Sequence, residues 1–199
     1  MSRRKTPVSK AMPKSFAKER YRTACAEPFL WLVKAREMRR AADLVWTQFM
    51  TELMSFTSGE EDTEEPFTGS VAMMLYGFCI ENLLKAGLVA SGAAVLPNGN
   101  FGLDSHALED LADELTVSLS EEERELMERL EHFISWAGRY PIPLYADALY
   151  PRDLLDGSKG VIYGLSSMDQ ERVHALILRV QALLPTEEEA LEASMRSRP

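Results

Sequence analysis

Six polar or charged residues interrupt the apolar parts of this sequence and are its best candidates for chemistry: Glu81, Asn82, Lys85, His106, Arg139 and Tyr140. Glu81 and Lys85 are four residues apart, so they share one face of a helix and can form an ion pair. If Lys85, His106 and Arg139 converge, they form a small cationic pocket suited to a phosphate or a nucleotide, in which Glu81 would orient one of the bases. The structural alternative is that the helix leaves the core here and its polar side chains reach solvent or cap neighbouring elements.

Other familiar kinds of site are excluded by spacing. Residues 157–160, Gly-Ser-Lys-Gly, lack the leading glycine and the following Ser or Thr of a phosphate-binding loop, and no glycine-rich dinucleotide motif is present. The histidines lie on separate predicted helices, without the spacing of a zinc site; they are His106, His132 and His174. Cys79 falls in the most apolar helix, where a small buried thiol is the usual explanation. We therefore predict no metal, no disulfide and no cofactor.

Helices must position the six residues, because apolar side chains recur at spacings of three and four. The first predicted helix covers residues 28–56, with an apolar stripe of Trp31, Ala35, Met38, Ala42, Val45, Phe49, Leu53 and Phe56. The second covers about residues 69–91. It is apolar on nearly every side as far as Glu81, which predicts the central, most buried element of the fold.

Three further helices follow in the second half of the chain. One begins at Ser105, and the next begins at Ser120, where Ser-Glu-Glu-Glu matches a capping box, and ends at Gly138. The last begins at the capping box Ser167-x-x-Gln170 and ends at Leu184, before a proline. No alternating strand pattern of useful length is present, so we predict an all-α protein, a bundle of about five helices.

The charge distribution divides the chain into three parts. Residues 1–22 contain eight Lys or Arg and one Glu, a net charge of +7, whereas the whole chain carries −9, which leaves −16 for the remainder. We predict a disordered basic arm over residues 1–24, a helical domain over 25–184 and an acidic, frayed tail over 185–199. A basic arm can bind phosphates, but an acidic body argues against a broad nucleic-acid surface.

The apolar segments of the sequence indicate where the protein is located. The longest charge-free apolar stretch, residues 71–80, is far shorter than the roughly 20 apolar residues that span a bilayer. The basic N-terminus is not followed by the apolar region of a secretory signal. We therefore expect no transmembrane helix and a cytoplasmic protein.

Three of these motifs resemble the HEPN superfamily in order and spacing: Glu81-Asn82-Leu83-Leu84-Lys85-Ala86, then Ser105-His106-x-Leu108-x-x-Leu111, then Arg139-Tyr140-Pro141. The resemblance covers about residues 69–143. It implies a short helical bundle that forms a homodimer. The short apolar stretches described above, rather than the resemblance, predict that no membrane is a partner. The resemblance also implies a possible partner protein, RNA or nucleotide as ligand, with Glu81, Lys85, His106, Arg139 and Tyr140 as the binding residues.

Many HEPN proteins are metal-independent ribonucleases that use an Arg, four to six intervening residues and a His. In that chemistry the His supplies acid or base and the Arg stabilises the charge on phosphorus. This sequence departs from the spacing at each of its histidines, and His106 has no Arg in the required window. The catalytic residues are therefore unknown, with His106 and Arg139 as the weak candidates.

Three hypotheses follow. The first is a non-catalytic HEPN-like module that binds a partner protein, a nucleotide or RNA in a toxin–antitoxin or defence-type system. The second is a divergent ribonuclease, in which the basic arm holds RNA and His106 with Arg139 replaces the usual pair. The third is a helical adaptor unrelated to HEPN proteins. The apolar stripe of the first helix predicts a homodimer, unless the C-terminal helix covers that stripe within one chain.

Overall fold

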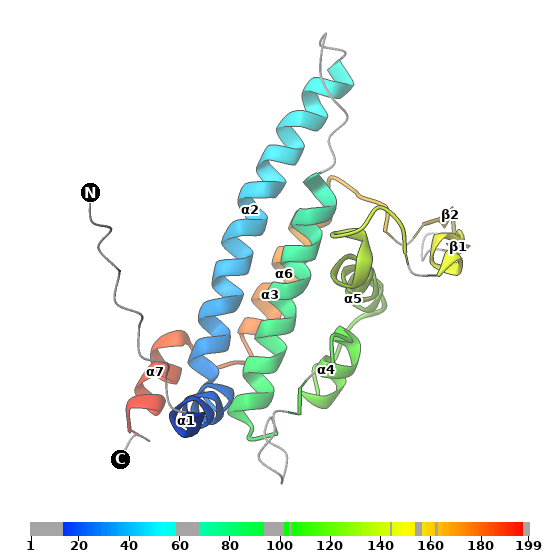
Figure 1. Ribbon diagram of the computed structural model, residues 1–199. Helices are drawn as coiled ribbons and strands as arrows, with labels where there is room; N and C mark the ends of the chain where they lie inside the picture. Colours follow the sequence, from blue (N-terminus) through cyan, green and yellow to red (C-terminus); the bar gives the residue numbers. More distant parts are fainter. Residues whose placement is uncertain are drawn as a thin grey trace, which may run out of the picture.

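The computed structural model describes residues 14–58, 68–93, 102–103, 105–143, 145–153, 157–161 and 163–196, and it is almost entirely helical (Figure 1). Within these residues the chain forms seven α-helices, a π-helical turn, a 3₁₀ turn and a two-stranded ribbon. The predicted all-α class is confirmed, but a bundle of about five helices is not. In chain order the elements are α1 (Lys14–Cys25), α2 (Pro28–Ser58), α3 (Thr68–Ala90), α4 (Leu108–Glu114), α5 (Glu121–His132), η1 (Phe133–Ala137), η2 (Ala146–Leu149), β1 (Arg152–Asp153), β2 (Lys159–Gly160), α6 (Asp169–Gln181) and α7 (Glu187–Arg196).

Helices α2 and α3 form a long antiparallel hairpin that frames the molecule (Figure 1). The buried residues of α2 recur at spacings of three, four and seven: Leu32, Ala35, Ala42, Trp46 and Phe49. Ala35, Ala42 and Phe49 belong to the predicted apolar stripe, whereas Leu32 and Trp46 lie outside it. Helix α3 is apolar on nearly every side and lies at the centre. Among the described residues it is the one helix long and apolar enough to cross a membrane, but 72% of its apolar window is buried inside the protein. This burial is typical of a core helix.

Helix α5 begins where predicted, and together with its continuation η1 it ends at the predicted Gly138. Its capping box is complete, because Ser120 Oγ accepts a hydrogen bond from Glu123 N at 3.2 Å and Glu123 Oε2 accepts one from Ser120 N at 2.8 Å. The helix continues into the π-helical turn η1 and stops at Gly138. A Cβ atom at position 138 would lie only 2.4 Å from Met74 Cβ on α3. Glycine therefore allows the end of η1 to approach α3, which determines where Arg139 leaves the helix.

Helix α6 does not begin at the predicted capping box. Its first residue is Asp169, and no side chain caps it in the way that Ser167 and Gln170 would. Instead, Asp169 forms a two-pronged ion pair with Arg129 of α5, with distances of 2.8 and 2.7 Å. Asp169 Oδ2 also accepts a hydrogen bond from Ser166 N at 2.8 Å. A buried contact with a distant helix, which local spacing cannot reveal, therefore sets this boundary.

Two intermediate segments also differ in detail from prediction. The helix expected from Ser105 begins at Leu108, because its first amides are capped from another helix rather than by a local side chain. In the stretch expected to be irregular, β1 and β2 form a minimal antiparallel ribbon that pairs Arg152 with Gly160 and Asp153 with Lys159.

Both ends of the described chain are more regular than the sequence predicted. Residues 14–25, assigned to a disordered arm over 1–24, form α1, while residues 1–13 lie outside the described part. Residues 187–196, assigned to a frayed tail, form α7. Thr186 and Glu189 cap α7 reciprocally, Arg36 of α2 pairs with Glu187 at 2.5 Å, and Ala190 belongs to the main core. The helical domain therefore extends beyond the predicted range of 25–184.

Candidate functional site

Glu81 and Lys85 form a buried ion pair on α3. Lys85 Nζ donates to Glu81 Oε1 at 2.7 Å, and the exposed fractions of the Lys85 and Glu81 side chains are 5% and 8%. One helical turn separates the two residues, as their spacing predicts. Because each charge neutralises the other away from water, the Lys85 ammonium is already engaged within the protein.

His106 completes this cluster from the segment that precedes α4. Its Nδ1 lies 3.0 Å from Glu81 Oε2. A carboxylate accepts hydrogen bonds, so we place the ring proton of neutral His106 on Nδ1, which leaves Nε2 as an acceptor. The His106 side chain is 63% exposed, whereas its partner is buried. Glu81 thus connects an internal cation with a surface imidazole.

The position of His106 depends on how α4 begins. No neighbouring side chain caps the first backbone amides of α4. Glu131 of α5 caps them instead, because its carboxylate accepts hydrogen bonds from Leu108 N at 2.5 Å and Glu109 N at 3.2 Å. Burial raises the pKa of Glu131, although these two amides oppose that shift. Helix α5 therefore holds the start of α4, and with it His106, against α3.

Arg139 and Tyr140 make their contacts elsewhere. Arg139 Nη2 donates to the Ser135 carbonyl oxygen in η1 at 2.8 Å, and its guanidinium lies 5.5 Å from the centre of the Tyr140 ring. The remaining candidate, Asn82, donates to the Phe78 carbonyl oxygen at 2.6 Å. These contacts stay within each residue's own segment.

The structure therefore brings together Glu81, Lys85 and His106 through direct contacts, and it gives Arg139 and Tyr140 other partners. Lys85 is neutralised by Glu81, so the described contacts favour the structural interpretation of the cluster over a cationic pocket. A ligand-binding role for these five residues remains a prediction.

A second polar cluster, which the sequence analysis missed, joins α2, α3 and α6. Asp43 Oδ1 accepts hydrogen bonds from Tyr76 Oη and His174 Nε2, both at 2.7 Å, and Gln170 Nε2 donates to Tyr76 Oη at 2.8 Å. Burial favours the protonated form of Asp43, but the Tyr76 and His174 hydrogen bonds outweigh it and lower the pKa of Asp43. Burial, with the neighbouring carboxylate, raises the pKa of Tyr76. Asp43 and His174 are 131 residues apart, so no sequence spacing could have linked them.

Two observations bear on metal binding and thiol chemistry. In the part of the chain that the structure describes, no group of three His, Cys, Asp or Glu side chains is arranged to hold a metal ion. Cys25 and Cys79 are both free and both buried. Burial raises the pKa of the Cys79 thiol to about 12, so Cys79 is an uncharged core residue at neutral pH.

The remaining histidine provides a prediction about pH. His132 is packed beside Trp136, and its Nε2 lies 3.1 Å from Arg152 Nη2. Burial, followed by repulsion from Arg152, lowers the pKa of His132 below its ordinary value of 6.5. The unfolded chain therefore takes up a proton first as the pH falls, and the folded state loses stability below about pH 6.5. Urea denaturation from pH 7.5 to 5 should show a smaller stability loss in His132→Gln than in the native protein. Equal losses in both proteins would contradict this assignment.

Comparison with protein-family models, with curated proteins and with solved structures yields no match to this chain. The function must therefore be argued from the chain's own residues and contacts.

Proposed function

We propose that this protein is a non-catalytic HEPN-like module that works by binding protein, with a second copy of itself as its first partner. The HEPN part of the proposal is supported by where the resembling motifs lie. Glu81 and Lys85 are on the central helix α3, His106 lies two residues before α4, and Arg139 lies two residues after η1. A cytoplasmic toxin–antitoxin or defence-type system is the setting in which we propose that it acts.

The non-catalytic part is supported by the contacts of the two candidate catalytic residues. His106 is held by Glu81, and the Arg139 guanidinium is held by Ser135 and Tyr140. A ribonuclease of this type needs an imidazole and a guanidinium directed at one phosphate. The divergent ribonuclease is the alternative in which Arg139 changes its partners when RNA binds. A helical adaptor unrelated to HEPN proteins is the second alternative.

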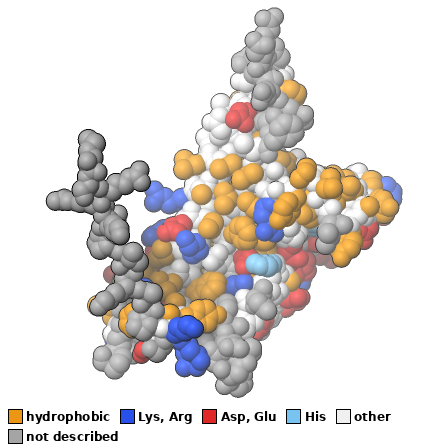
Figure 2. Space-filling model, viewed as in Figure 1, with side chains coloured by type: hydrophobic (Ala, Val, Ile, Leu, Met, Phe, Trp, Pro, Cys, Tyr) orange, Lys and Arg blue, Asp and Glu red, His pale blue; other side chains and the backbone are white. Residues whose placement is uncertain are grey.

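One observation carries the protein-binding proposal: the hairpin has an apolar face that other described elements leave partly open. We call it the hairpin face, and it consists of half-buried residues of α2 and α3, namely Met38, Val45, Val71, Met74, Leu75 and Phe78. Apolar side chains spread over both helices and continue toward η2 (Figure 2). Exposed apolar residues extend the surface after η1: Tyr140, Ile142, Tyr145, Leu149 and Tyr150.

The two helices present these residues on the same side. Met38 and Val45 follow Trp31 at intervals of seven, and Phe78 precedes Asn82 by four, so each set forms one stripe along its helix. Trp31 and Asn82 line the same pocket, which places both stripes on one face of the hairpin. Contiguous apolar surface of this kind is typical of protein interaction sites.

Neither of the last two helices accounts for this face. Helix α6, which corresponds to the predicted C-terminal helix, contacts α2 through His174 and Asp43, and Asp43 lies about 140° around α2 from Met38. Helix α7 is tied to α2 through Arg36, which is five residues after Trp31 and therefore lies about 140° around the helix from it. Of the predicted stripe, Phe49 is only 6% exposed, whereas Trp31, Met38 and Val45 remain half-buried. Within the described chain, α7 thus packs on another side of α2. An identical face on a second copy would cover the hairpin face symmetrically.

Sedimentation velocity at tens of micromolar protein tests the proposal. We expect a dimer for the native chain and a monomer for Met38→Glu and Phe78→Glu, because a carboxylate in an apolar interface must be desolvated without a partner. Leu44→Glu is the matched control, since Leu44 is 75% exposed on the same helix but outside the hairpin face. It should remain dimeric. A native monomer would refute the homodimer, and dimers of all four proteins would refute the hairpin face as its interface.

A further inference from the structure

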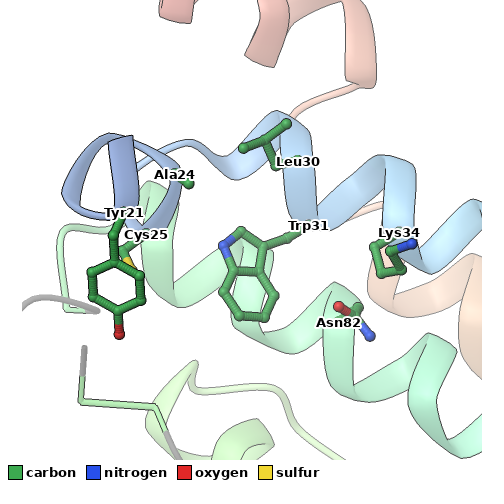
Figure 3. A pocket seen from close by; sticks show the side chains of 7 residues that line it. All are labelled: Tyr21, Ala24, Cys25, Leu30, Trp31, Lys34 and Asn82. Carbon is green, nitrogen blue, oxygen red and sulfur yellow. The ribbon is translucent and has the colours of Figure 1, made fainter. Parts of the chain in front are cut away.

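A small apolar pocket lies at the foot of the hairpin, where α1 crosses α2 and α3 (Figure 3). Its volume is 270 Å³, close to the lower limit of about 300 Å³ for pockets that bind small ligands. The lining residues are Tyr21, Ala24, Cys25, Leu30, Trp31, Lys34 and Asn82. The pocket shares no residue with the Glu81–Lys85–His106 cluster or with the hairpin face, although Trp31 and Asn82 lie on the same side of the hairpin as that face.

The pocket is suited to a flat aromatic group. Trp31 of α2 and Tyr21 of α1 both turn their rings to it, and Asn82 of α3 stands beside Trp31 (Figure 3). One of the two N–H groups of the Asn82 amide donates to the Phe78 carbonyl oxygen at 2.6 Å. The amide oxygen points toward the Trp31 side of the pocket. The pocket therefore combines stacking surfaces with a hydrogen-bond acceptor, which suits the amino group of a base.

The rim of the pocket is basic although the body of the protein is acidic. Lys14, Lys18 and Arg22 succeed one another at intervals of four along α1, and all three are exposed. In the helical repeat Lys14 and Lys18 lie within about 60° of Tyr21, and Arg22 lies about 100° from it, so the three cations lie on or beside the side of α1 that lines the pocket. Glu19 is the one acidic residue of α1. Four more Lys or Arg precede α1 in the sequence.

We propose that this pocket takes one base of a single-stranded nucleic acid whose phosphates lie along α1. Aromatic rings that stack bases, next to a row of Lys and Arg, are the usual means of binding single strands. An acidic peptide would also be attracted to α1, but its carboxylate cannot bond to the Asn82 oxygen, and an aliphatic acid has no flat ring to stack on Trp31 and Tyr21. This inference goes beyond the protein-binding function proposed above and does not depend on it.

Fluorescence anisotropy with labelled ten-nucleotide RNA and DNA, and with an RNA duplex of equal length, tests the pocket in the full-length protein. We expect single strands to bind more tightly than the duplex. Trp31→Ala should weaken single-strand binding by about tenfold or more, and Trp31→Phe should restore most of it, because stacking needs only an aromatic ring. Ala24→Phe fills the pocket from α1 without removing a core residue, so its expected loss of binding does not depend on the stability of Trp31→Ala.

The basic rim is tested through salt dependence. Each phosphate contact to a single strand contributes roughly 0.7 to the slope of log affinity against log salt. Changing Lys14, Lys18 and Arg22 together to Gln removes three such contacts and should therefore reduce the steepness of that slope by about 2. The control changes three exposed cations elsewhere to Gln: Arg40, Lys159 and Arg196. It should leave the slope unchanged, and so should Trp31→Phe.

Three results would overturn the proposal. The first is that no single strand binds even at low salt, and the second is that Trp31→Ala and Ala24→Phe bind as tightly as the native chain. The third is that an acidic peptide shows the same dependence on Trp31 while nucleic acid does not. None of these results bears on the dimer, whose failure would appear in sedimentation alone.

Discussion

Replacing Lys85 with Met should lower the free energy of unfolding by about 3–5 kcal/mol, because it leaves the Glu81 carboxylate buried without its cation. Both side chains are more than nine-tenths buried, and their 2.7 Å contact is the one that neutralises Glu81 inside the protein. His106 is the other partner of that carboxylate, and its exposed ring is a poor substitute for a buried ammonium.

Urea denaturation of three variants measures this effect. The double variant Glu81→Leu/Lys85→Met should recover most of the loss, since an apolar pair of similar volume replaces the ion pair. Lys159→Met is the matched control, because Lys159 belongs to an exposed pair with Asp153, and it should change stability by about 1 kcal/mol or less. If Lys85→Met proved as harmless as Lys159→Met, the cluster would not be structural and a ligand site at Lys85 would regain support.

The Asp169→Asn substitution should be similarly costly, at about 3–5 kcal/mol, because it removes the charge of the buried carboxylate that pairs with the Arg129 guanidinium. Asp169 is fully buried, and the exposed fraction of the Arg129 side chain is 11%. The same aspartate accepts the Ser166 amide, so the start of α6 should loosen with it. Hydrogen exchange at the first amides of α6 should therefore quicken more than exchange in α2.

Asp153→Asn is the control for this pair, because it removes a carboxylate whose side chain is 78% exposed. We expect it to leave both stability and hydrogen exchange close to native, as most exposed ion pairs contribute about 0–1 kcal/mol. An Asp169→Asn protein as stable as this control would show that Ser166 and the surrounding core, rather than the ion pair, position α6.

The parts of the fold that were predictable from sequence are those governed by local patterns. The stripe along α2, the apolar character of α3 and the capping box at Ser120 each depend on residues within a few turns of one helix. The pairing of Glu81 with Lys85 belongs to the same class, because four residues separate them.

Long-range contacts explain most of what sequence reasoning missed. Asp43 meets His174, and Arg129 meets Asp169, only after separate helices have packed. The start of α4 likewise depends on a side chain of α5. The ends of the chain differ for other reasons. At the N-terminal end a high content of charge was interpreted as disorder, and at the C-terminal end the acidic tail was interpreted as frayed. Helix α7 in fact places Ala190 in the core, and the Thr186–Glu189 capping motif that begins it was there to be noticed.

The convergence predicted for Arg139 and His106 was inferred from the order of motifs along the chain, and that order alone does not predict which residues meet. Order along the chain places residues on successive helices but does not fix which side of each helix they occupy. Gly138 brings the end of η1 against Met74, which lies nearly two turns before Glu81 on α3. The Arg139 guanidinium then finds acceptors in its own segment.

The most direct test of a binding module against a nuclease is the fate of RNA incubated with the protein. Labelled single-stranded RNA would be mixed with purified native protein, His106→Ala and Arg139→Ala in chelator-containing buffer, and its length would be followed over hours on denaturing gels. We expect the RNA to remain full length with all three proteins. Steady cleavage by the native protein that is lost in His106→Ala and Arg139→Ala would contradict the proposed function and establish the divergent ribonuclease instead.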